Sequence, residues 1–247
     1  MKKVLASVGI GNATVDTVLE TTSVSPGDTV DARIEIDGGD AEQEVGAVRL
    51  ELETEFLTED EGYRDADLRT YTLSEGFTIE PGEERTIGTQ LDVPYETPLT
   101  VGGTEVWVET ELDISMAVDP EDVDYLDVEP TPRMAATFDA MEKLGFSLHS
   151  VEVSADPFDR YFGSRFAQEF EYVPASGEFA GDVDEVELLV QDGDDELDVF
   201  VEVDRRGGVF TELAEADEER ARFSVGDGDA DVDALAERLR DEIAALS

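Results

Sequence analysis

The sequence contains no cysteine, and this absence excludes several kinds of chemistry. Without thiols there is no disulfide, no thiolate nucleophile and no cysteine-ligated zinc site. The single histidine, His149, is too little for a histidine metal site or a nucleophilic triad. Because His149 shares an alternating pattern with Val151 and Val153, we expect it on an apolar strand face, partly buried and hydrogen-bonded.

Positive charge and long apolar runs are also scarce. Lysine occurs only as Lys2, Lys3 and Lys143, and the chain has no basic stripe, so we expect no nucleic-acid binding. No apolar stretch is long enough to span a bilayer, and the short run after Lys3 is broken by Gly9 and Gly11. These features predict a cytoplasmic protein without stable membrane insertion.

Negative charge is present in large excess. The 247 residues include 64 Asp plus Glu against 17 Lys plus Arg, a net charge of −47. One interpretation is a solvated acidic coat on a protein that works in concentrated salt; the other is a nucleic-acid mimic, or a binder of basic partners or divalent metal. The acids are interleaved with apolar residues along the whole chain, and this diffuse pattern favours the coat. The coat predicts a fold whose stability depends on salt.

Runs with a period of two predict β-strands with one face on a core and one in water. Turn signals such as Pro26-Gly27 and Pro81-Gly82 separate these runs. We therefore predict a mainly β fold of two tandem antiparallel β-sandwiches, residues 1–127 and 128–247. The expected strands lie near 13–19, 30–36, 48–56, 87–93, 106–118, 149–153, 166–172, 186–190, 197–203 and 222–225.

Residues 119–145 interrupt the alternation, and we interpret them as an acidic loop followed by a helix at about 132–144. Thr131 can cap this helix, Pro132 suits its first position, and Gly145 suits the left-handed residue after its last turn. A second amphipathic helix is expected at about 232–246, with Asp231 as its cap. A short helical turn is also expected at 209–216.

No motif identifies a catalytic, cofactor or metal site. Carboxylates are so common that a glycosidase pair cannot be recognised among them. The segment from Asp227 begins like a calcium loop but has Val232 and Arg238 where Gly and Glu are needed. We therefore predict no cofactor, no bound metal and no enzymatic activity.

Two short segments are candidate protein-interaction sites. Aromatic and arginine residues are enriched at interfaces, and an adjacent basic pair is unusual on so acidic a chain. In each case a structural role competes: the arginine pair could hold a turn to neighbouring carboxylates, and the aromatic loop could pack its rings into the core. The candidates are Arg205 and Arg206, and in the loop Phe158, Arg160, Tyr161 and Phe162.

Several segments resemble known proteins. Residues 75–83, EGFTIEPGE, followed by 91–94, LDVP, resemble the strand–PGE turn–strand signature of the arrestin-like superfold. Residues 6–19, 106–114, 124–132 and 201–208 resemble the sporulation-control family of the stage-zero protein M type, over nearly the whole chain. The resemblance implies two arrestin-like β-sandwiches and a non-enzymatic regulator or scaffold that acts through other proteins, in the control of development or the cell cycle.

Two hypotheses of different classes therefore remain. The first is this regulatory scaffold, adapted to high salt, whose partners are other proteins bound by strand addition or in a groove; self-association into a homo-oligomer is left open. The alternative is a β-sandwich ligand-binding module or hydrolase for carbohydrate, with cations held by carboxylates. A cleft lined by aromatics beside a close carboxylate pair would favour the alternative.

Overall fold

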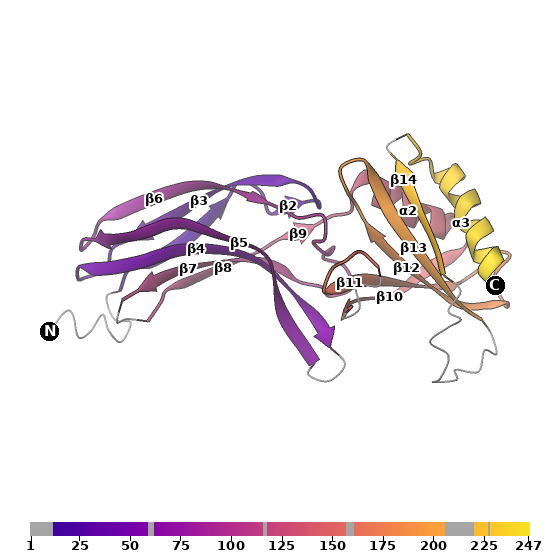
Figure 1. Ribbon diagram of the computed structural model, residues 1–247, viewed down its shortest axis with the longest axis horizontal. Coiled ribbons are helices and arrows are strands. Elements are labelled where there is room, and N and C mark those ends of the chain that lie inside the picture. The colour runs from indigo at the N-terminus through magenta and orange to yellow at the C-terminus, as the bar shows by residue number, and fades with distance from the viewer. Residues whose placement is uncertain (1–11, 59–61, 116–117, 157–160, 206–219, 227) are drawn as a thin grey trace. The chain divides into compact units, whose positions relative to one another are not determined.

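The structure, a computed structural model, describes residues 12–58, 62–115, 118–156, 161–205, 220–226 and 228–247 (Figure 1). The chain is mainly β, and the described part has two helices, α2 (Pro132–Lys143) and α3 (Val232–Leu246). Two compact units form. Unit 1 comprises residues up to 55, 65–97 and 105–128; unit 2 comprises 56–64, 98–104 and 129–247.

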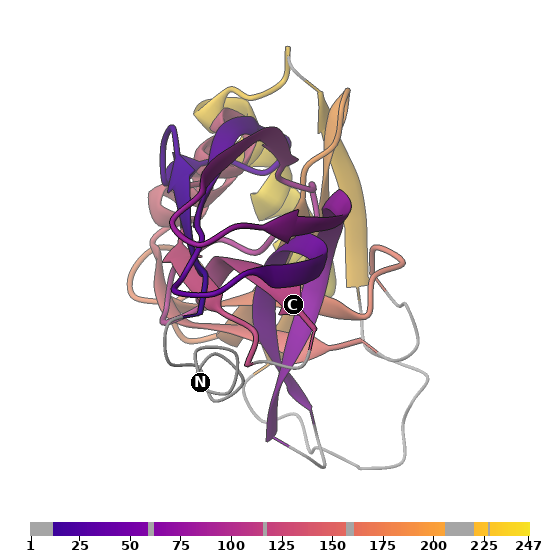
Figure 2. The same ribbon diagram turned by 90° about the vertical axis from the view of Figure 1, so that its left-hand side faces the viewer.

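Unit 1 consists of two facing sheets, which Figures 1 and 2 show as two layers. One sheet has the order β1-β3-β6, and the other joins β5 to β4, β7 and β8. A short parallel pair, β2-β9, completes the unit. The strands are β1 (Thr14–Leu19), β2 (Ser23–Val24), β3 (Thr29–Asp37), β4 (Gln43–Thr58), β5 (Gly62–Ile79), β6 (Glu84–Asp92), β7 (Val106–Ile114), β8 (Glu121–Tyr125) and β9 (Asp127–Val128).

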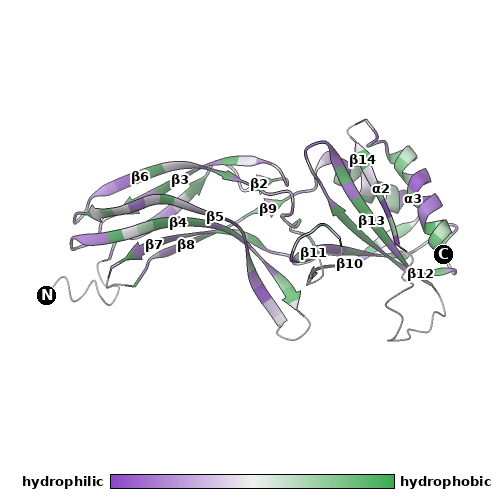
Figure 3. Ribbon diagram, in the orientation of Figure 1, coloured by the Kyte–Doolittle hydropathy of each residue, from purple (hydrophilic) through white to green (hydrophobic). Residues whose placement is uncertain are grey.

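Alternation of apolar and polar residues builds this unit. In β4 and β3 every second side chain is buried, and Figure 3 shows the matching alternation of hydrophobic and hydrophilic residues along β4. Leu50 and Leu52 of β4 and Ile34 of β3 have essentially no exposed surface. The two inner faces therefore form one apolar core, as in other β-sandwiches.

The β1 and β8 margins of the two sheets are joined by side chains. The backbone N–H of Thr17 in β1 donates to Oδ2 of Asp122 in β8 over 2.7 Å, and the Thr17 hydroxyl lies 2.7 Å from that of Thr110 in β7. Just beyond, Asp127 N–H donates to the Thr22 carbonyl over 2.7 Å, where β2 and β9 pair. These contacts place β1 beside β8 at this margin of unit 1.

Unit 2 is built on one antiparallel sheet, in the order β14-β13-β12-β11-β10. Its strands are β10 (Phe146–Ala155), β11 (Phe166–Pro174), β12 (Val183–Gln191), β13 (Glu196–Arg205) and β14 (Arg220–Gly226). Helices α2 and α3 pack on each other and cover one face of this sheet, so helices form its second layer (Figure 1). Phe170, Leu188 and Val201, which are aligned across three strands, are buried on the helix side.

The helices begin and end as the sequence predicts. The Thr131 side chain accepts from the Met134 N–H, and Asp231 accepts from the Ala234 N–H, so both caps are confirmed. Gly145 has φ of +90°, and a Cβ there would lie 2.5 Å from the Ser176 carbonyl oxygen. Only glycine therefore fits the residue that ends α2 and returns the chain to β10.

Part of the acidic loop expected after residue 119 is in fact β-structure, namely β8 and β9. The sequence pattern misses β8 because its inward positions are Asp122 and Asp124 rather than apolar residues. Of β5, only residues 75–79 were expected, from the arrestin-like resemblance, since most of its side chains are exposed and give no alternation. The helical turn predicted at 209–216 lies outside the described residues.

A single domain boundary between 127 and 128 was expected, and unit 1 has its last segment end at Val128. Two earlier segments nevertheless belong to unit 2. Leu57 at the end of β4 is in parallel register with Ser154 of β10. The side-chain amide of Gln168 donates to the Leu99 carbonyl and accepts from the Leu99 N–H, both over 2.8 Å, so one side chain anchors the 98–104 segment.

Candidate interaction surfaces

Tyr161 and Phe162 lie against the face of the unit 2 sheet opposite the helices. Tyr161, Ala167, Leu189 and Phe200 form a buried group on which the partly buried Phe162 packs; we call these five residues the Tyr161 cluster. The rings of Tyr161 and Phe162 meet the Phe200 ring edge-to-face, with centroids 5.5 and 5.1 Å apart. Such geometry is favourable for aromatic pairs.

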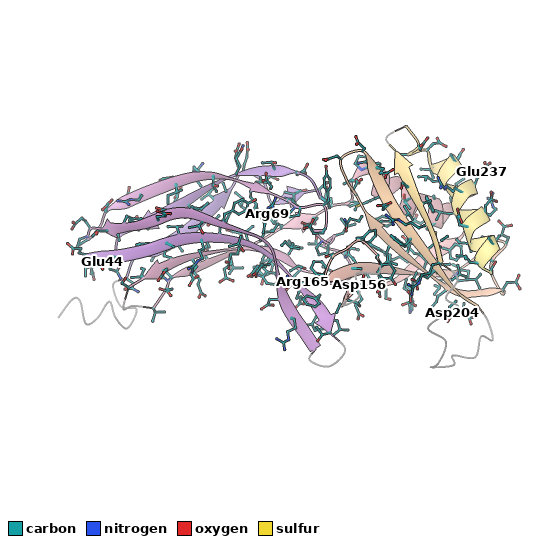
Figure 4. All side chains as sticks on the ribbon, viewed as in Figure 1. Glu44, Arg69, Asp156, Arg165, Asp204 and Glu237 are labelled. Carbon is teal, nitrogen blue, oxygen red and sulfur yellow. The ribbon has the colours of Figure 1, made fainter. Side chains whose placement is uncertain are left out.

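Polar contacts fix Tyr161 in place. Its hydroxyl donates to Glu202 Oε1 over 2.9 Å, and its backbone N–H donates to Oδ2 of Asp156, a residue marked in Figure 4, over 3.1 Å. Tyr161 itself is only 7% exposed. For Tyr161, then, the structural role weighed in the sequence, a ring packed into the core, is the one observed.

Two arginines of β14 extend the cluster toward solvent. Arg220 places Nε 2.6 Å from Glu202 Oε1 and its guanidinium 5.6 Å from the centre of the Tyr161 ring. Arg222 lies 5.0 Å over the Phe200 ring and 3.1 Å from Asp198, and its side chain is 57% exposed. The alternation of β14 thus brings arginine and aromatic groups to one surface that the sequence analysis did not assemble.

The other candidates are not brought into this surface by the described residues. Arg205 ends β13 opposite Val183, and the structure does not describe its side chain. Arg206, Phe158 and Arg160 lie outside the described residues. An interaction role for these four residues remains a prediction.

Next to the Tyr161 cluster, three glutamates face one another across adjacent strands. The register aligns Glu171 of β11, Glu187 of β12 and Glu202 of β13. Burial raises the pKa of Glu187 to about 7, with further increases from Glu169, Glu202, Glu185 and Glu171. Like charges directly opposite in a sheet are destabilising, so this row costs the fold stability when it is ionised.

The expectation of a partly buried His149 is wrong. The β10–β11 register shifts between Leu148 and Ser150, so His149 falls at a β-bulge and leaves the apolar face. Its side chain is 62% exposed and its Nε2 lies 3.9 Å from Glu171 Oε1. A bulge adds one residue to a strand, which no period-two pattern can reveal.

Unit 1 carries a second aromatic surface, on the outer face of β7 and β8. Trp107 and Tyr125 are directly opposed, and their ring centroids lie 6.5 Å apart. Tyr125 is 59% and Val123 44% exposed, and the indole N–H of Trp107 donates to Glu53 Oε2 of β4 over 2.6 Å. We call Glu53, Trp107, Val123 and Tyr125 the Trp107 patch. Sequence analysis missed it, although Val106 and Val108 pointing inward require Trp107 to point outward.

The described residues hold neither a candidate metal-binding cluster nor a helix that could span a membrane. In those residues, no group of three or more His, Cys, Asp and Glu side chains is arranged to hold a metal ion. No helix in the described part is both long and apolar enough to cross a membrane.

Comparison with known proteins decides the family. The SpoOM protein family matches residues 1–207. The chain belongs to the SpoOM family. It is 38% identical, over 234 residues and 90% of each chain, to the sporulation-control protein Spo0M of Bacillus subtilis (strain 168). The crystal structure of Spo0M from Bacillus subtilis matches with a TM-score of 0.87 and 32% identity, covering 96% of this chain and 100% of that one.

The SpoOM match confirms the resemblance in the sequence and the mainly β, arrestin-like fold. It also places the chain among sporulation-control proteins rather than in a known enzyme family.

Proposed function

We propose that the protein is a non-enzymatic cytoplasmic regulator that acts by binding other proteins and is adapted to concentrated salt. Membership of the sporulation-control family supports the regulatory role. The net charge of −47 supports the adaptation to salt. Binding to other proteins requires an exposed contact surface on the molecule.

The arginine-bearing side of the Tyr161 cluster is the observation that carries this proposal. Arg222, 57% exposed, lies over the Phe200 ring, and Phe162 packs edge-to-face on the same ring. Aromatic and arginine side chains supply a large share of the binding energy at protein interfaces. Phe200 and Arg222 stand on strands, and Phe162 packs on Phe200 from the loop before β11, so the side chains are held in place and less entropy is lost on binding.

Affinity capture from extract of the source cell, kept at multimolar salt and read by mass spectrometry, tests the proposal. Arg222→Glu is compared with Arg33→Glu, whose side chain is equally exposed at 59% but lies in unit 1. We expect a reproducible partner that is lost with Arg222→Glu and kept with Arg33→Glu. Loss with Arg205→Glu/Arg206→Glu instead would move the site to the end of β13.

A partner retained by every variant would contradict this location. No partner at all would contradict the binding role, and the carbohydrate-binding alternative would then be tested with sugars and divalent cations. Circular dichroism of each variant at the same salt concentration checks that the fold is kept.

A further inference from the structure

The Trp107 patch has a composition that the fold of unit 1 does not require. The side chains of Val123 and Tyr125 stand in solvent on the outer face, away from the core. An exposed aromatic and an exposed valine beside the only tryptophan of the chain form an apolar island on an otherwise acidic sheet. Apolar side chains clustered within a polar rim are typical of contact sites.

The charged groups around this island are carboxylates. Glu53 accepts from the Trp107 indole, and burial raises the pKa of Glu53 to about 7, with further increases from Glu109, Asp67 and Glu51. These groups come from β4, β5 and β7, the strands around the tryptophan. Arg49 of β4 is paired with Glu111, 3.2 Å away. The patch therefore concentrates negative charge around aromatic rings.

A cation matches both properties of this surface. The face of an aromatic ring carries negative potential, and guanidinium groups stack on tryptophan and tyrosine more often than ammonium groups do. Because the indole N–H is already donated to Glu53, Trp107 offers a ligand its ring rather than a hydrogen-bond donor. The aliphatic stem of an arginine could at the same time cover Val123.

We propose that the Trp107 patch binds an arginine side chain presented by an extended segment of a partner protein. The inference rests on the proposed function only in that the occupant is a protein; it concerns a different unit and different residues. The guanidinium stacks on Trp107 or Tyr125 and pairs with Glu53 and Glu109. Binding adds positive charge to a group of carboxylates in which Arg49 already pairs with Glu111.

The single tryptophan makes the test direct, since all indole fluorescence comes from the patch. A short blocked peptide containing one arginine between glycines is titrated at multimolar KCl, where the Debye length is below about 3 Å and diffuse attraction is screened. The matched probe carries citrulline, which keeps the planar shape without the charge. We expect a saturable change in emission with the arginine peptide and none with the citrulline peptide.

Variants locate the binding. Tyr125→Ala and Glu53→Gln should each weaken binding of the arginine peptide about two- to fivefold, the range for one exposed cation–π or charge contact. Two control variants should leave binding unchanged. They are Tyr63→Ala, at a tyrosine that is 63% exposed and lies outside the patch, and Glu44→Gln, at a glutamate that Figure 4 labels. Lowering the pH below about 7 should weaken wild type more than Glu53→Gln, because protonation of Glu53 then adds to that of Glu109, whose pKa burial also raises.

Three results would overturn the inference. The first is an equal response to arginine and citrulline, and the second is equal weakening by the patch and control variants. The third is the absence of a saturable response up to about 10 mM peptide. A titration over that range detects any Kd near or below about 1 mM. Because the peptide titration needs no cell extract, its failure would leave the capture experiment on unit 2 standing, and the converse also holds.

Discussion

Two carboxylates of unit 2, Asp192 and Glu187, affect its stability in opposite directions. Asp192, 4% exposed, closes the turn between β12 and β13 and holds the start of α2. It accepts hydrogen bonds from the Thr131 hydroxyl and the Gly193 N–H, and it lies 2.8 Å from the Arg133 guanidinium. One carboxylate thus joins the cap of α2 to the sheet.

Asp192→Ala should destabilise unit 2 by about 3–5 kcal/mol, because it breaks the buried ion pair with Arg133 and removes the acceptor of the Thr131 hydroxyl. Urea denaturation at constant multimolar KCl measures the change. Asp195→Ala, in the same turn but exposed, should change the free energy of unfolding by less than about 0.5 kcal/mol. An Asp192→Ala midpoint equal to that of wild type would show that the ion pair contributes nothing.

Glu187 acts in the opposite direction. Burial raises the pKa of Glu187 from 4.5 to about 7, so folding favours its protonated form. The resulting penalty is absent below the unfolded pKa, grows as pH rises through about 4.5 to 7, and is complete above about 7. Glu187→Gln should therefore raise the melting temperature above pH 7 and have no effect near pH 4.

Melting curves across this pH range, recorded at fixed salt, test the Glu187 prediction. Glu237→Gln on the exposed side of α3, labelled in Figure 4, is the control and should show no such pH-dependent gain. A Glu187→Gln gain that is constant from pH 4 to 8 would mean that ionisation of Glu187 is not its cause.

At the scale of elements, α3 is stabilised mainly by packing. Leu235, Ala236, Leu239 and Ile243 form its buried stripe, and α3 contacts α2, β13 and β14. Leu239 has no exposed surface, so Leu239→Ala should cost about 2–5 kcal/mol through lost burial and a cavity. Urea denaturation measures it, with Glu237→Ala as an exposed control on the same helix; similar midpoints for both variants would show that α3 does not support unit 2.

The helices were predictable because their signals are local. Caps, an apolar stripe and a following glycine all lie within a few residues, and α2 and α3 match the expected 132–144 and 232–246 closely. β8 was not predictable, since its inward Asp122 meets a backbone N–H more than a hundred positions away, at Thr17. The Tyr161 cluster was not predictable for a similar reason. The sequence indicates the aromatic loop, but only the strand register brings Phe200 and Arg222 next to it.

For the whole molecule, the question is how a chain with net charge −47 stays folded. Within each unit, neighbouring carboxylates also repel one another locally. Burial, together with neighbouring carboxylates, raises the pKa of Glu51, Glu53 and Glu109 in unit 1 and the pKa of Glu187 in unit 2. Unfolding separates these groups, so repulsion favours the unfolded state unless ions screen it.

We therefore predict that the melting temperature rises steeply between dilute buffer and multimolar KCl at pH 7.5. At about 1 M salt the Debye length is about 3 Å, shorter than most distances between surface carboxylates. Sucrose at matched osmolarity is the control: it strengthens burial but does not screen charge, so it should recover only part of the gain. Lowering the pH to 5 in dilute buffer should recover part of the gain as well, because protonation of Glu53 and Glu187 removes charge.

A circular dichroism melt that is unchanged between the two salt concentrations would contradict the acidic coat as an adaptation to salt. The negative surface would then need another explanation, and binding of basic segments, as proposed for the Trp107 patch, would be the first to test.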